Sequence, residues 1–140
     1  MGETQSDEVR ETVTGEGYAV GNIDGIGEGP GFRKIRQELG VNAFGVNAIV
    51  IPEGAGSNNH WHDEQEELYL VHQGHLEFVF GDESRHLLGP GGLARVDAHT
   101  VRQVRNVGGG DAIYVCVGGK DGYVGRDGRM SEGESRTTGG

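Results

Sequence analysis

Apolar residues along this chain form short runs, and most of these runs alternate with polar residues instead of repeating at the helical spacing. Gly, Asn or Asp ends each run, which is typical of short β-strands separated by tight turns. The predicted strands cover residues 18–23, 45–51, 67–72, 75–80, 85–88, 93–96, 101–105 and 112–117. Residues 33–39 offer two helical turns, but Gly31 and Gly40 bracket them closely, so we interpret them as a further strand. This pattern predicts an all-β sandwich or barrel.

The two ends of the chain lack this pattern. Residues 1–15 are polar and acidic, and residues 119–140 are rich in Gly, Ser, Thr and charge, with Tyr123 and Val124 their only pair of adjacent apolar residues. Such segments bury too little apolar surface to offset the entropy of ordering them. We therefore expect a disordered tail at each end and a single folded domain over residues 16–118, which suits a chain of 140 residues.

The charge balance restricts the partners. The chain has 12 Lys and Arg against 22 Asp and Glu, a net charge of −10, which argues against nucleic acid and anionic membranes as partners. No apolar run is long enough to span a membrane, and the acidic N-terminus is not a secretory signal, so the cytoplasm is the expected location by default. Cys116, the single cysteine, lies in an apolar run and is expected to be a small buried hydrophobe.

The chemistry of this sequence gathers in residues 54–74. His60 and His62 are two residues apart, so on a strand both imidazoles project from one face. Glu67 follows after a polar turn and opens an apolar strand. If these two strands form a hairpin, two imidazoles and one carboxylate converge, a donor set that suits one divalent Fe, Mn, Zn, Ni or Cu ion.

The spacing of this segment resembles the first motif of the cupin superfamily. Gly54, His60, His62, Glu67 and Gly74 occupy every fixed position of that motif, and the segment falls among predicted strands. The resemblance covers residues 30–117. It implies a small single-domain, jelly-roll-like β-barrel whose interior holds a metal on His60, His62 and Glu67, and it suggests a homodimer.

The second motif of that superfamily is only partly present. Gly91 and Asn106 match it, whereas Asp97 stands in place of Pro and His99 in place of Gly. Arg102 stands where the resemblance implies a fourth ligand, a histidine. Strand alternation places Arg102 on the less polar face of residues 101–105, so we expect it to point inward.

A permanently charged arginine cannot ligate a metal and would repel one, which leaves three arrangements. In the first, His60, His62 and Glu67 alone hold the metal, and Arg102 anchors an anionic ligand beside it. In the second, His99 supplies a fourth ligand from a turn. In the third, no metal binds and Arg102 pairs with Glu67.

Two function classes follow from these arrangements, because a fold alone does not fix an activity. The first is a metal-binding protein that takes a small, anionic organic ligand, with dioxygenase or isomerase activity if it is an enzyme. The second is a metal-free binding or sensing module with a pair between Glu67 and Arg102. By strand alternation, Tyr69 and Phe78 are expected to line the ligand cavity together with Arg102.

Overall fold

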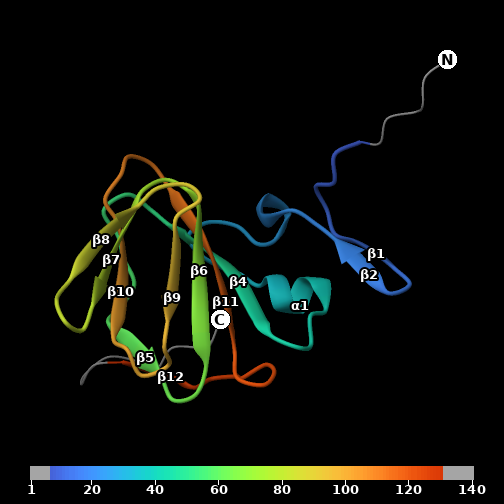
Figure 1. The fold of residues 1–140 in the computed structure, drawn as a ribbon. Helices are drawn as coiled ribbons and strands as arrows, with labels where there is room; N and C mark the ends of the chain where they lie inside the picture. Colours follow the sequence, from blue (N-terminus) through green and yellow to red (C-terminus); the bar gives the residue numbers. More distant parts are fainter. Residues whose placement is uncertain (1–6, 131–140) are drawn as a thin grey trace.

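The computed structural model describes residues 7–130 of the chain, and residues 1–6 and 131–140 lie outside the described part. Two five-stranded antiparallel sheets pack face to face (Figure 1). The first sheet has the order β12-β5-β10-β7-β8 and the second has the order β3-β4-β11-β6-β9. This arrangement confirms the expected all-β, jelly-roll-like class.

The strands follow the alternation of the sequence closely. Those of the first sheet are β12 (Gly128–Met130), β5 (His60–His62), β10 (Arg102–Asn106), β7 (Leu76–Phe80) and β8 (Arg85–Leu88). Those of the second are β3 (Gly31–Arg33), β4 (Gly45–Ile51), β11 (Ala112–Gly119), β6 (Glu66–Gln73) and β9 (Leu93–Val96). The bounds of β4, β8 and β9 are those expected from the sequence.

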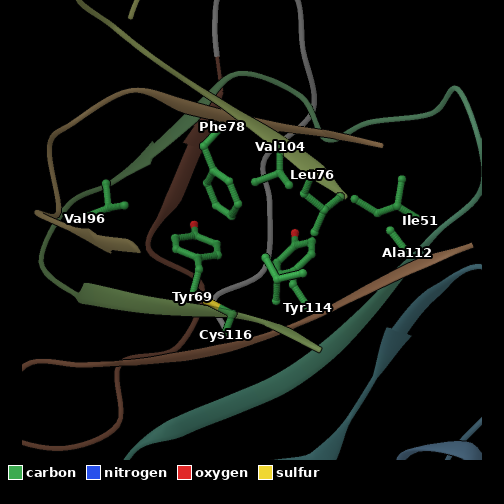
Figure 2. Close-up of a cluster of buried hydrophobic side chains, with 10 residues drawn as sticks. Ile51, Tyr69, Leu76, Phe78, Val96, Val104, Ala112, Tyr114 and Cys116 are labelled. Atoms are coloured by element: carbon green, nitrogen blue, oxygen red, sulfur yellow. The ribbon is translucent and has the colours of Figure 1, made fainter. Parts of the chain in front are cut away.

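The core lies between the two sheets. Figure 2 shows rings and aliphatic side chains from both sheets meeting there, among them Tyr69, Phe78 and Tyr114. The ring centroids of Tyr69 and Phe78 lie 5.4 Å apart in an edge-to-face contact, which is a favoured aromatic geometry. Cys116 is buried in the same cluster, as expected.

The expected strand over residues 33–39 is wrong for most of its length. Only Arg33 belongs to a strand, β3, and Ile35–Leu39 forms helix α1, which ends at Gly40 in the left-handed conformation. Gly40 therefore caps a helix instead of ending a strand. Ile35 packs against buried residues of β4 and β11, so α1 covers part of the outer face of the second sheet.

The expected disordered tails are also wrong where the structure describes them. A hairpin of β1 (Val13–Gly15) and β2 (Tyr18–Val20) begins before residue 16 and stands apart from the sheets (Figure 1). Residues 119–130 continue past the expected boundary to β12, which pairs with β5. Polar contacts order this segment, so its shortage of apolar residues was misleading. The parts of both expected tails in residues 1–6 and 131–140 lie outside the described residues.

Within residues 7–130, no helix has the length and apolar character needed to cross a membrane. Location in the cytoplasm stays a prediction. The homodimer also stays a prediction. The outer face of β6 and β9 exposes Leu68, Leu70 and Leu93.

Both motif glycines have a positive φ, 78° at Gly54 and 81° at Gly74, a backbone conformation that favours glycine. A side chain at Gly54 would meet no atom within 4 Å, whereas a Cβ at Gly74 would lie 3.0 Å from the backbone of Ala112. We expect Gly54→Ala to lower the free energy of unfolding by about 1–2 kcal/mol. Gly74→Ala should cost a further ~1–3 kcal/mol through the clash. Chemical denaturation measures both, and equal losses would contradict the close approach at Gly74.

Candidate metal centre and cavity

The two histidines and the glutamate come from opposite sheets. His60 and His62 lie on β5, and Glu67 lies on β6 of the facing sheet. The expected hairpin between their strands is therefore wrong, because residues 63–65 carry the chain across the sandwich from one sheet to the other. The three side chains meet by facing one another across the interior, and not as neighbours in one sheet.

The expected convergence of these side chains is confirmed. One ligand atom from each of His60, His62 and Glu67 lies within 4.8 Å of the others. His62 and Glu67 are buried, and His60 is partly exposed. The three residues thus lie close enough to hold one ion.

A carboxylate fixes the orientation of His62. Nδ1–H of His62 donates to Oδ1 of Asp127 at 2.8 Å, which leaves Nε2 facing Oε1 of Glu67 at 3.3 Å. Asp127 also accepts hydrogen bonds from the backbone N–H groups of Glu64 and Gln65, each at 2.9 Å, and from Nε2 of Gln65. A carboxylate on the far nitrogen of a metal-binding histidine holds the tautomer whose other nitrogen can ligate. His60 is held similarly, with its Nδ1 3.1 Å from the backbone oxygen of Asn58.

Two side chains support Glu67 from behind. The hydroxyl of Tyr69 donates to Oε1 of Glu67 at 2.5 Å, and Nη2 of Arg102 lies 3.3 Å from the same oxygen. Arg102 points inward, as expected, and is fully buried. Its remaining donors are also used within the protein: Nη1 donates to the backbone oxygens of Ala98 and Thr100, and Nε donates to the hydroxyl of Tyr69.

The charges of the site shift its ionisation. Burial raises the pKa of Glu67, but hydrogen bonds from His62 and Tyr69 and the charge of Arg102 outweigh burial and lower its pKa to about 2. Burial lowers the pKa of His62, but Glu67 and Asp127 outweigh it, and the net pKa lies above the usual value. Burial lowers the pKa of His60. Glu67 is therefore a carboxylate at neutral pH, and the His60 imidazole is held neutral, which is the form that ligates a metal.

These residues fit a divalent transition metal. Two imidazole nitrogens and a carboxylate oxygen are the donors that such ions prefer, and Asp127 orients one imidazole for that purpose. The buried charge of Arg102 would repel the ion. The negative charge of Glu67 offsets it, because Glu67 is paired with both Arg102 and His62.

A cavity of about 510 Å³ adjoins this centre, a volume typical of small-molecule sites. His60, His62, Glu67 and Tyr69 form one part of its wall. The other walls come from β3, β4, β11, β12 and the loop before β5 and include Phe32, Ile49, Ile51, Tyr114 and Met130.

Of the three residues expected to bind the ligand, only Tyr69 borders the cavity. Tyr69 lines the cavity, whereas Phe78 lies in the core with no exposed surface and Arg102 lies behind Glu67; neither of these two borders the cavity. His99, the alternative fourth ligand, is exposed on the turn after β9 and does not join the cluster of donors.

Sequence reasoning missed Asp127, Gln65 and Tyr114. Asp127 falls in the segment that the sequence predicts to be a tail, and its partner His62 is 65 residues away, so no local pattern connects them. Tyr114 could have been found, because it shares the alternation of Cys116 on a predicted interior strand. Gln65 shares the alternation of Glu67 and Tyr69, but it lies before the predicted strand, in the polar turn after His62.

Comparison with known proteins agrees with this architecture. A family model described as the cupin domain matches residues 48–118. A cupin protein from Bacteroides fragilis has a similar structure at 21% identity and a TM-score of 0.59, covering 67% of this chain and 80% of that one. A sugar phosphate isomerase of the cupin superfamily from Silicibacter pomeroyi is 24% identical, with a TM-score of 0.59 over 81% of this chain and 71% of that one.

A DMSP lyase from Ruegeria pomeroyi is more distant, at 20% identity and a TM-score of 0.57; the match covers 66% of this chain but only 46% of the lyase. At such identities the likeness shows the fold and not the activity. No curated protein matches the sequence.

The contacts of Asp127 predict a large effect of a small substitution. Asp127→Asn replaces one acceptor oxygen with a donor that faces the N–H groups of Gln65 and Glu64. Because hydrogen bonds to a buried charge are strong, we expect a loss of about 3 kcal/mol in the free energy of unfolding. Asp121→Asn, at an exposed position of the same segment, should change it by less than about 0.5 kcal/mol. A wild-type denaturation midpoint for Asp127→Asn would show that Asp127 does not anchor this segment.

Proposed function

The chain belongs to the cupin family, and on that premise we propose that His60, His62 and Glu67 hold one divalent transition metal beside a cavity for a small organic ligand. The observation that carries this proposal is the convergence of three donor atoms within 4.8 Å, together with the contact between Asp127 and His62. An ion in this position supplies Lewis-acid or redox chemistry to a ligand in the cavity. Both dioxygenase and isomerase activities, which the resemblance implies, are compatible with this donor set.

Each side chain around the site has a distinct role in this proposal. Asp127 holds His62 in the tautomer that ligates through Nε2. Tyr69 and Arg102 hold Glu67 in place and keep it ionised. The buried position of His62 and Glu67 excludes bulk water from one side of the site, so ligand exchange takes place from the cavity.

The expected role of Arg102 as an anchor for an anionic ligand finds no support in its contacts. Nη1, Nη2 and Nε all donate to protein oxygens, and the guanidinium does not border the cavity. An anionic group on the ligand would therefore depend on the metal for its counter-charge. We propose instead that Arg102 positions Glu67.

A second candidate function rests on one specific observation, the buried ion pair between Arg102 and Glu67 at 3.3 Å. This pair balances the carboxylate without any metal. It supports a metal-free binding or sensing protein that uses the same cavity, and the two candidates differ in whether the protein takes up an ion.

Metal content decides between these candidates. We expect the full chain, purified without a metal-affinity tag, to contain about one equivalent of a transition metal by mass spectrometry. His60→Ala and Glu67→Ala should lose most of the metal. His72→Ala and Glu66→Ala change exposed residues of β6 and should retain it. Wild-type protein without metal, and without a gain in melting temperature on adding Fe(II), Mn(II), Zn(II), Ni(II) or Cu(II), would favour the metal-free candidate.

The role of Arg102 is tested by Arg102→Met. Removing one member of a buried ion pair leaves Glu67 uncompensated, so we expect a loss of about 3–5 kcal/mol in unfolding free energy. The double variant with Glu67→Gln should recover part of this loss. If the site holds a metal, added Zn(II) should raise the melting temperature of Arg102→Met more than that of the wild type, because a repelling charge is gone. An unchanged stability of Arg102→Met would contradict the positioning role.

A further inference from the structure

Tyr114 carries a hydroxyl that the fold leaves unused. The residue lies on β11, borders the cavity and is only 5% exposed. Its hydroxyl makes no hydrogen bond with any residue of the described part of the chain. Its neighbour Tyr69, whose ring centroid lies 5.6 Å away, instead donates to Glu67. Burial raises the pKa of Tyr114, so this hydroxyl stays protonated and can donate.

The Tyr114 hydroxyl is not among the fully enclosed polar atoms that lack a partner, and the residue lies on the cavity wall. This hydroxyl is therefore available to donate to a group inside the cavity. Figure 2 shows the hydroxyl oxygen of Tyr114 directed into the space between the sheets. The pairing of β11 with β6 also shifts register between Ile113 and Tyr114, and such irregularities are common where a strand presents a side chain to a site.

The other walls of the cavity indicate what a ligand looks like away from Tyr114. Phe32, Ile49, Ile51 and Met130 supply apolar surface. Neither a lysine nor an arginine borders the cavity among residues 7–130. A group with two negative charges, such as a phosphate, would lose its hydration beside these apolar walls, where no lysine or arginine replaces it.

We propose that the cavity receives a small ligand with an apolar body, a head that reaches His60, His62 and Glu67, and an uncharged acceptor oxygen, such as a carbonyl, that accepts a hydrogen bond from Tyr114. The inference deepens the proposed function and rests on it for the head alone. The apolar body and the acceptor oxygen depend on the cavity walls and on Tyr114, so they can be tested whether or not a metal is present.

The test compares three probes on the as-purified full chain by displacement of the neutral dye N-phenyl-1-naphthylamine, whose fluorescence reports an apolar cavity. Acetophenone has an apolar body and a carbonyl, ethylbenzene has the same body without an acceptor, and glycerol 3-phosphate carries a dianion. We expect acetophenone to displace the dye and glycerol 3-phosphate not to do so. Tyr114→Phe should raise the half-displacement concentration of acetophenone about two- to tenfold, and change that of ethylbenzene by less than about twofold.

Tyr18→Phe is the matched control, because Tyr18 is 62% exposed on the β1–β2 hairpin, away from the cavity. It should alter neither probe. An equal shift for acetophenone and ethylbenzene in Tyr114→Phe would indicate a merely structural role and overturn the proposal. Displacement by glycerol 3-phosphate, or no binding of the dye, would overturn it as well.

Metal content is measured on the same samples, so the two proposals fail separately. Protein without metal that still distinguishes acetophenone from ethylbenzene through Tyr114 refutes the metal site and supports the donor role of Tyr114. Protein with metal whose Tyr114→Phe variant treats the two probes alike refutes the donor role and leaves the metal site in place.

Discussion

The buried carboxylate of Glu67 is the constraint on which the interior of this protein depends. A carboxylate without water is stable only if positive charge and hydrogen-bond donors surround it. Here Tyr69, His62 and Arg102 supply them. Because Glu67 belongs to one sheet while His62 and Arg102 belong to the other, the compensation of this one charge also joins the two sheets. The apolar core can form with many residues, but this polar contact fixes how β6 lies against β5 and β10.

The same constraint explains why the C-terminal segment is ordered. His62 can serve Glu67 through Nε2 only if Nδ1 has its own partner, and Asp127 is that partner. Asp127 in turn needs donors, which Gln65 and the backbone of residues 64 and 65 provide. Each buried polar group thus requires the next, and the chain of contacts ends at β12, beyond the limit that apolar content indicates. Polar satisfaction, and not apolar burial, sets the boundary of the fold at this end.

Prediction from the sequence succeeded where the relevant interaction is local. Alternation and turn residues locate β4, β8 and β9, because a strand buried on one face must alternate along its own length. The spacing from Gly54 to Gly74 brings the candidate ligands together for a similar reason. Errors arose where the outcome depends on distant residues: α1 forms because Ile35 packs on the outer face of the sheet, and β5 faces β6 instead of pairing with it. The inward direction of Arg102 was correct, but its hydrogen-bond partners depend on a turn whose shape the sequence does not reveal.

The position of Arg102 has a consequence for the chemistry of the cavity. An arginine in the place where the superfamily motif has a histidine removes a potential ligand. Its guanidinium donates to Tyr69 and Glu67 within the protein and does not face the cavity. The cavity therefore has ionisable groups at one end, around His60 and Glu67, while most of its remaining walls are apolar, with polar side chains at Ser57, Asn58 and Tyr114. In such a site, affinity comes from the apolar body of a ligand, and orientation comes from the few polar groups. A ligand that satisfies the polar end and Tyr114 at once can bind in one orientation only, so the separation between these two groups determines which molecules fit.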